Sequence, residues 1–265
     1  MITYGPCQTP TLGFCVDQAE KIKKFVPEPY WSIETVIAGD KGKAFQLKWT
    51  RGKIFERSVV QILHSRFCSV SSAEVIDIEK SKKYKGKPAG LNTVKMLKVA
   101  SKTYGMSAHD TMRIAEHLYL RGFITYPRTE STTYSSNFNF EEILQQHQSH
   151  PEWGYYAAAL LRGEGFSKPQ KGVDAGDHPP ITPVLSATKS ELGDREWKLY
   201  QFITKTFLGS ISEDAVYDEV RVRFAVGQLE TFKLKGIVLK KRGFLEIMTW
   251  QAQNDKEIPT YKIGD

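Results

Sequence analysis

The stretch GFITYPRTES, residues 122–131, decides how the middle of this chain folds. Pro127 disfavours the α conformation in the residue before it, so the backbone of Tyr126 is pushed toward an extended form. A helix that precedes this stretch must therefore end before Tyr126, and Gly122 is the residue type that most often ends one. We predict a short strand from Phe123 to Tyr126 that holds the tyrosine ring away from the backbone.

The chemistry of this stretch lies in a phenol followed by a guanidinium. Arg128 carries a permanent positive charge and five N–H donors, which suit it to hold a phosphate at two oxygens. A phenol has an ordinary pKa of about 10, so a nucleophilic tyrosine needs nearby positive charge, a base or a metal. Tyr126 beside Arg128 fits attack on a phosphodiester. A strand tyrosine followed by a turn, with Arg128 in a surface salt bridge, explains these residues equally well.

Two predicted helices precede this stretch. The first spans residues 91–104, and Gly105 turns the chain. Ser107 and Asp110 form a capping box that starts the second helix, which Gly122 ends. One face of this second helix is predicted from the spacing of Ala108, Met112, Ala115 and Tyr119. Two helices joined by a short turn form a helix-turn-helix shape, which is often purely structural and is by itself a weak indication of DNA binding.

The segments on either side of the helices are rich in β-strand patterns. Before them, Thr9 followed by Pro10 predicts a helix with Thr9 as its N-cap. A turn at residues 39–42 and alternating apolar residues at 45, 47 and 49 predict strands, followed by a helix at 58–67 and a strand at 75–79. After the helices, residues 220–226 alternate and residues 231–239 return as a second strand.

This order predicts an α+β multidomain protein, in which a discontinuous β-rich domain carries an inserted, mainly helical, helix-turn-helix-like domain. We predict a helical lead-in at 1–26, a first β segment at 27–88, the helical domain at 89–208 and a second β segment at 209–265. The lysine-rich segment 80–87 is predicted to be a solvated linker.

Composition limits the class of protein. The net charge of +7 favours a polyanionic partner. Three cysteines without a CxxC pair argue against a disulfide framework or a zinc site and favour a reducing compartment. No apolar run approaches the roughly 18 residues that a membrane span needs, and no signal peptide is visible, so we expect a soluble intracellular chain without a membrane partner.

Three motifs together resemble the type IA DNA topoisomerases. Residues 122–131 are similar to the active-site motif of that family. The segment TYGPCQTPTLGF, residues 3–14, is similar to the segment before its gate domain. The segment DAGDHPPITP, residues 174–183, lies where the family carries its active-site histidine. The motifs occur in the family's order across essentially the whole chain, and their wording is closest to eukaryotic topoisomerase III, more to its beta form than to its alpha form.

The resemblance implies roles for individual residues. Tyr126 would attack a single-strand phosphodiester and stay joined to the 5′ end, and the strand would be resealed without ATP. Arg128 would hold the scissile phosphate. His178 would contact the phosphate or handle a proton. Glu130 occupies a position where the family carries an acidic residue, and an exposed turn carboxylate is the alternative for it.

Gln8 and Thr9 resemble family residues that line the groove for a single strand, although Thr9 also has an explanation as a helix cap. The pair Pro6-Cys7 departs from the bacterial form of this motif, where an arginine commonly falls, which puts a phosphate contact there in doubt. Asp174, Asp177 and His178 resemble a metal cluster in composition, but a loop trio without a further ligand is a poor metal site and we reject it. No metal ligand is therefore predicted within the chain.

The family implies a larger protein and further partners. Its Mg2+ ligands, a glutamate and an Asp-x-Asp pair, belong to an N-terminal Toprim domain, and this sequence has no Asp-x-Asp. We therefore expect a fragment that comprises the gate and catalytic-tyrosine domains, with the β domain acting as a hinged arch. The implied substrate is single-stranded or locally unpaired DNA, with RNA as a further candidate. The resemblance also implies a Tudor-domain partner and a nuclear location, with a cytoplasmic pool as an alternative.

Two other interpretations compete with this enzyme. A non-catalytic helix-turn-helix nucleic-acid-binding protein accounts for the charge and the helix pair, but not for the three motifs. A degenerate paralogue would be expected to lose one of Tyr126, Arg128 and His178, and all three are present. A covalent adduct at Tyr126 would separate these readings, whereas DNA affinity alone would not.

The absence of an acidic metal site in the sequence leads to a first prediction. The purified 265-residue chain will leave a negatively supercoiled plasmid unchanged in the presence of Mg2+, because the metal ligands of the family are not among its residues. Gel electrophoresis of the plasmid measures this, and catalytic relaxation by the chain alone would refute it.

Overall fold

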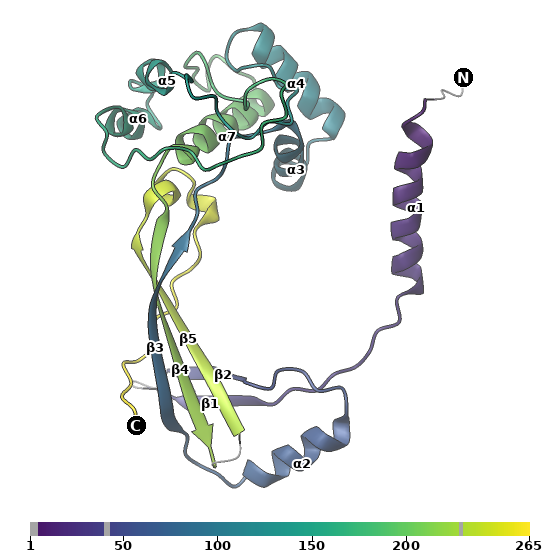
Figure 1. Ribbon diagram of the computed structural model, residues 1–265, viewed down its shortest axis with the longest axis vertical. Coiled ribbons are helices and arrows are strands. Elements are labelled where there is room, and N and C mark those ends of the chain that lie inside the picture. The colour runs from purple at the N-terminus through teal and green to yellow at the C-terminus, as the bar shows by residue number, and fades with distance from the viewer. Residues whose placement is uncertain (1–4, 40–42, 228–229) are drawn as a thin grey trace. The chain divides into compact units, whose positions relative to one another are not determined.

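The chain folds into helices and one β-sheet, and the computed structural model describes residues 5–39, 43–227 and 230–265 (Figure 1). The elements follow one another as α1 (Gln8–Lys24), β1 (Glu34–Ala38), β2 (Ala44–Trp49), α2 (Arg57–Phe67), β3 (Glu74–Lys85), α3 (Thr93–Tyr104), α4 (Ala108–Leu120), α5 (Phe140–His147), α6 (Gly154–Leu161), α7 (Asp194–Ser210), β4 (Ala215–Val226), β5 (Glu230–Lys241) and the short 3-10 helices η2 (Gly243–Glu246) and η3 (Thr249–Gln251). No helix in these ranges combines the length and apolar character needed to cross a bilayer.

Two compact units divide the chain, each built from separate segments. Unit 1 comprises Met1–Ile78, Arg221–Leu234 and Pro259–Asp265, and unit 2 comprises Glu79–Val220 and Lys235–Ile258. Several unit boundaries fall inside β3, β4 and β5, because each of these long strands contributes residues to both units. The predicted domain boundaries after residues 26, 88 and 208 differ from the boundaries of these compact units. They stay a prediction of which segments act together in function.

The sheet has the strand order β1-β2-β5-β4-β3. β1 and β2 pair antiparallel, and β2 pairs antiparallel with β5 through Lys48–Lys233 and Trp49–Phe232. The predicted alternation in β2 is confirmed, since its burial alternates along the whole strand. The predicted turn at 39–42 falls mostly outside the described residues, as do the first two residues of the 3–14 motif.

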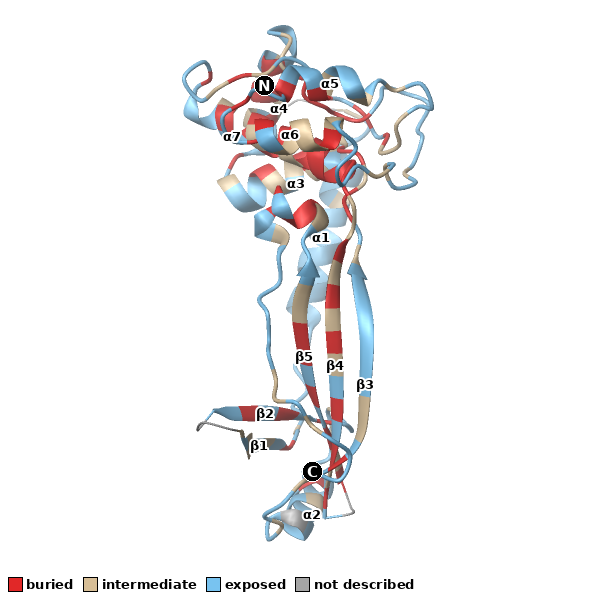
Figure 2. Cartoon of the chain, turned by 90° about the vertical axis from the view of Figure 1, so that its left-hand side faces the viewer, coloured by how far each residue is buried: buried red, intermediate tan, exposed pale blue. Residues whose placement is uncertain are grey.

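The prediction of a linker at residues 80–87 is wrong for most of that segment. Lys80 to Lys85 form the second half of β3, which continues without a break from Glu74. β3 is an edge strand, and its residues are largely exposed, whereas buried residues alternate along β4 (Figure 2). Lysine side chains are compatible with an edge strand because they stay in water and discourage pairing with another chain.

The predicted N-cap of α1 is also wrong. The helix begins at Gln8 with Cys7 as its N-cap, so Thr9 lies inside the first turn. The hydroxyl of Thr11 donates to the carbonyl oxygen of Cys7 at 2.6 Å, and the Thr11 N–H donates to the same oxygen at 3.1 Å. Pro10 is tolerated in this turn because its missing N–H would have no partner within the helix.

Helices α3 and α4 and the turn between them lie where they were predicted. Gly105 takes a left-handed φ of 63°, and the Ser107 hydroxyl accepts a hydrogen bond from the Asp110 N–H at 3.0 Å. The predicted buried face of α4 is partly wrong. Ala115 is buried, but the other buried positions are Thr111, Ile114 and Leu118, and Tyr119 is 41% exposed.

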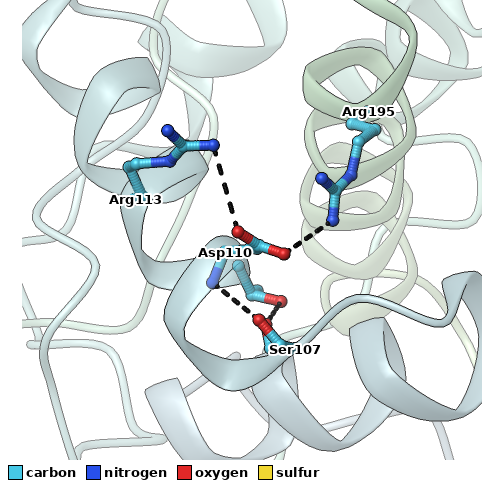
Figure 3. A network of polar contacts seen from close by, with 5 residues as sticks. Ser107, Asp110, Arg113 and Arg195 are labelled. Carbon is cyan, nitrogen blue, oxygen red and sulfur yellow. Dashed lines mark hydrogen bonds and ion pairs between the residues drawn. The ribbon is translucent and has the colours of Figure 1, made fainter.

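Polar contacts tie α4 to the buried helix α7. Asp110 accepts a hydrogen bond from Arg195 of α7 at 3.1 Å and lies 3.9 Å from Arg113, while its backbone is held by Ser107 (Figure 3). These contacts hold the pKa of Asp110 below its ordinary value, chiefly through the Arg195 hydrogen bond. The N-terminal half of α4 is therefore fixed to the core of unit 2.

A buried histidine lies in the aromatic part of this core. The indole N–H of Trp153 donates to Nδ1 of His147 at 3.1 Å, and Trp153 also stacks on His150 at a ring-centroid distance of 3.6 Å. Burial, and then the proximity of His150, lower the pKa of His147 to about 4. Since the bond from Trp153 requires an unprotonated Nδ1, this core is built for a neutral ring.

This histidine makes the stability of the chain sensitive to acid. The folded pKa is about 4 and the ordinary value is 6.5, so the unfolded chain binds more protons between these limits and stability falls as the pH falls. We expect His147 to account for about 2 kcal/mol of lost unfolding free energy between pH 7 and pH 4.5. Urea denaturation of wild type and His147→Gln at both pH values measures this loss. His109→Gln, at an exposed position of α4, should keep the wild-type pH dependence; an equally steep dependence in His147→Gln would contradict the assignment.

Candidate active site

The segment before Tyr126 is extended and pairs with the chain near Thr182. The Thr125 N–H donates to the Thr182 carbonyl oxygen, and the Thr182 N–H donates to the Thr125 hydroxyl, both at 2.9 Å. The pairing is limited to an isolated bridge between Ile124 and Pro183. Residues 123–126 therefore do not form the β-strand that was predicted, although they are extended. The Thr182 N–H is taken by the Thr125 side chain, and the Phe123 N–H donates to the Leu118 carbonyl oxygen at 3.0 Å, so neither extends the pairing.

This pairing brings Tyr126 and His178 together. Their rings meet edge to face at a centroid distance of 4.6 Å. Tyr126 also packs edge to face against Tyr119, at a centroid distance of 5.3 Å. Tyr126 is half-buried, and His178 is exposed. Edge-to-face packing is a preferred aromatic geometry, so the phenol is held between two rings at a site that solvent reaches.

The turn that follows Tyr126 is held by one hydroxyl group. Oγ1 of Thr93, at the start of α3, donates to the Pro127 carbonyl oxygen at 2.6 Å and accepts from the Thr129 N–H at 2.8 Å. The Thr93 N–H in turn donates to the Thr129 carbonyl oxygen at 3.1 Å. Arg128 lies between the two residues that Thr93 fixes, so its backbone position is set by the first turn of α3.

Arg128 pairs with Glu116 of α4. Its Nε lies 3.0 Å from Oε1 of Glu116, and Nη2 contacts the same oxygen. The hydrogen bond and charge of Glu116 raise the pKa of Arg128 further above its ordinary value. Both side chains are well exposed, at 59% and 41%, so the guanidinium is open to a ligand from solvent.

Asp177 joins the loop that carries His178 to the residues after Arg128. Its carboxylate accepts hydrogen bonds from the Ser131 hydroxyl at 2.6 Å and the Glu130 N–H at 2.8 Å, and Oγ1 of Thr129 lies 3.0 Å away. These bonds, in that order, lower the pKa of Asp177 to about 2. The carboxylate is therefore ionised at neutral pH and keeps the two segments together.

The site thus presents a phenol, an imidazole and a guanidinium on neighbouring segments that hydrogen bonds hold together. A phenol is a nucleophile, an imidazole can transfer a proton, and a guanidinium binds phosphate oxygens. This set of groups suits the opening and closing of a phosphodiester.

Comparison with known sequences agrees with this chemistry. The sequence model of the DNA topoisomerase family matches residues 1–265. The chain belongs to this family. It is 43% identical over 265 residues to DNA topoisomerase 3-beta of Arabidopsis thaliana and 42% identical over 266 residues to DNA topoisomerase 3-beta-1 of Homo sapiens. Both matches include 100% of this chain but 30% and 31% of the relatives, so the chain spans about a third of their length. The predicted family is confirmed, and the similarity to these 3-beta relatives agrees with the predicted beta form.

A solved structure supports the fold. The full-length topoisomerase I of Thermotoga maritima matches with a TM-score of 0.74 at 23% identity, over 100% of this chain and 43% of that chain. The mixed helix and sheet architecture is therefore shared with a member of the family, and the predicted α+β class is confirmed at that level.

The predicted site residues fall into two groups. Tyr126, Arg128, His178 and Glu130 lie together in unit 2, although Glu130 takes part through its backbone N–H while its side chain is exposed. Gln8 and Thr9 belong to the first turn of α1 in unit 1. The role of each residue toward nucleic acid stays a prediction.

Four residues of the site were missed from sequence alone: Thr93, Glu116, Tyr119 and Asp177. Glu116 and Tyr119 are three residues apart on α4, a spacing that places both on one face toward the same segment. The position of Asp177 directly before His178 was a signal that it belongs to the site. Its hydrogen-bond partners at 129–131, however, come from a segment that is distant in the sequence.

The Asp177 contacts lead to a prediction about local stability. Replacing Asp177 with alanine removes the acceptor of the Glu130 N–H, so native-state hydrogen exchange of that amide should accelerate by about tenfold or more. NMR-detected exchange measures this. Asp174→Ala is the matched control, because the one hydrogen bond recorded for Asp174 comes from Gly176 in its own loop. Equal exchange at Glu130 in the wild type and Asp177→Ala would contradict the assignment.

Proposed function

We propose that this chain carries the strand-cutting residues of a type IA topoisomerase. Tyr126 would cleave one strand of single-stranded or locally unpaired DNA, hold its 5′ end as a phosphotyrosine, and reseal it after another strand has passed. The observation that supports this most directly is the contact of Tyr126 with His178, next to Arg128, in a chain of the DNA topoisomerase family.

The proposed step exchanges one phosphodiester for another. The Tyr126 oxygen forms a bond to phosphorus as the bond from phosphorus to O3′ breaks; the phenol loses its proton and O3′ gains one. Resealing reverses each change, so the bond energy is kept and ATP is not needed. Lowering a phenol pKa from about 10 to about 7 requires about 4 kcal/mol in favour of the phenolate. Arg128, as a cation, and His178, whose ring lies against the phenol, would share this stabilisation.

The residues described do not offer a site for the Mg2+ that the family implies. Among them, no group of three or more histidine, cysteine, aspartate or glutamate side chains is arranged to hold a metal ion. Asp177, which resembles a ligand in sequence, is engaged by three donors from residues 129–131. Binding of Mg2+ by carboxylates outside residues 1–265 stays a proposal.

The proposal extends to the two units. We infer that the β-rich part acts as the gate, or arch, and that the helical part carries Tyr126 as it opens. Rigid-body movement of this kind is a known way to separate two ends of a cut strand. The RNA substrate, the Tudor-domain partner and the nuclear location also remain proposals that rest on the family resemblance.

Trapping the covalent intermediate tests the proposed function. Residues 1–265 replace the matching segment of human DNA topoisomerase 3-beta-1, and the graft is incubated with Mg2+ and 3′-labelled single-stranded DNA before denaturation. We expect labelled protein, and we expect Tyr126→Phe to reduce it to background, because a phenyl ring has no nucleophile. Tyr155→Phe is the matched control, since Tyr155 is an 81% exposed tyrosine of α6.

The outcomes separate the competing functions. A band that disappears in Tyr126→Phe and persists in Tyr155→Phe supports cleavage with a 5′ linkage. No band from the wild-type graft, with single-stranded DNA binding intact, would favour the non-catalytic nucleic-acid-binding protein instead.

A further inference from the structure

Glu116 engages one particular edge of the Arg128 guanidinium. Both Nε and Nη2 of Arg128 point at the same oxygen of Glu116, with the Nε–Oε1 distance at 3.0 Å. A guanidinium has five N–H donors, so two are taken by Glu116 and three are left. The remaining donors lie on Nη1 and on the outer side of Nη2, which together form the second edge of the same planar fork.

The pair does not have the properties of a stabilising element. Its side chains are 59% and 41% exposed, and a surface ion pair of this kind contributes little to folding. Arg128 would also keep its charge without Glu116, because a guanidinium is protonated at any physiological pH. The pair therefore has an effect chiefly on where the guanidinium points.

Helix α4 delivers this contact together with a second one. Tyr119 lies three residues after Glu116 on the same face and packs its ring against Tyr126 at 5.3 Å. One face of one helix thus touches both the phenol and the guanidinium. The opposite side of α4 is anchored in the core, where Ile114, Ala115 and Leu118 are buried.

We propose that Glu116 is a positioning residue for the reaction at Tyr126, an inference that rests on the proposed cleavage. Glu116 holds the Nε/Nη2 edge of Arg128 and thereby turns the Nη1/Nη2 edge toward the phosphodiester. The negative charge of Glu116 is unfavourable for nucleic-acid affinity, and the orientation it imposes on Arg128 favours the transition state. Glu116 thus acts through Arg128 and does not itself touch the reacting atoms.

The proposal distinguishes two replacements of Glu116. Glutamine keeps an oxygen that accepts from Nε and Nη2, whereas alanine removes it. In the graft used to trap the adduct, Glu116→Ala should slow adduct formation at saturating DNA by about tenfold or more while DNA affinity stays the same or rises. Glu116→Gln should restore the rate to within about threefold of wild type.

Two further variants exclude a general structural effect. Glu164→Ala removes a similar exposed pair, in which Arg162 Nε lies 2.8 Å from Glu164 Oε1, and should leave the rate unchanged. In an Arg128→Ala background, Glu116→Ala should have no additional effect on the rate, because its only route to the reaction is gone. A wild-type rate or a faster rate in Glu116→Ala, or an equal loss in the Arg128→Ala background, would overturn the proposal.

A second measurement stands apart from cleavage. In the 265-residue chain, the Arg128 Nε–H resonance is followed by NMR while oligothymidylate of about ten nucleotides is added. We expect this resonance to stay at its Glu116-bonded position while the oligonucleotide perturbs the Nη groups. Movement to the position seen in Glu116→Ala would mean that the phosphate displaces Glu116, and it would overturn the proposal. If no adduct forms but the bond from Arg128 Nε–H to Glu116 is retained, the proposed cleavage is rejected, whereas the orientation of Arg128 by Glu116 is not.

Discussion

The site depends on the pairing between Thr125 and Thr182. Two hydrogen bonds of 2.9 Å join these residues, one between backbones and one that uses the Thr125 hydroxyl. The Thr182 N–H is used by the Thr125 hydroxyl and the Phe123 N–H by the Leu118 carbonyl oxygen, so the pairing stops after a single bridge. Tyr126 comes directly after Thr125 and His178 comes shortly before Thr182, so an antiparallel pairing places both at the same end of the bridge, where their rings meet.

The groups of the site are fixed by several separate parts of unit 2. Thr93 at the start of α3 holds the turn around Arg128, Asp177 holds the loop of His178, and α4 contributes Glu116 and Tyr119. Each part has its own anchor in the core or in a helix end. Preorganisation of this kind reduces the movement that reacting groups must undergo, which is how positioned dipoles and charges accelerate a reaction.

The structure differs from the sequence-based prediction at β3 and at Tyr119 of helix α4. The charge of the lysines at 80–85 predicts a linker. An edge strand, however, accepts exposed lysines as readily as a loop does. Tyr119 fits the helical period of α4, but it is 41% exposed and packs on Tyr126. For β3 the deciding neighbour, β4, is distant in sequence, whereas Tyr126 follows Tyr119 closely along the chain.

The sequence by itself determined the local features and the family. The Ser107 cap, the left-handed Gly105, the alternation in β2 and the motif at 122–131 follow from short-range sterics and hydrogen bonding, which a few neighbouring residues specify. Only the tertiary structure decided that Glu116 meets Arg128 and that Asp177 meets residues 129–131. Such pairs depend on how separate segments pack, and no local pattern records which partner a side chain will find.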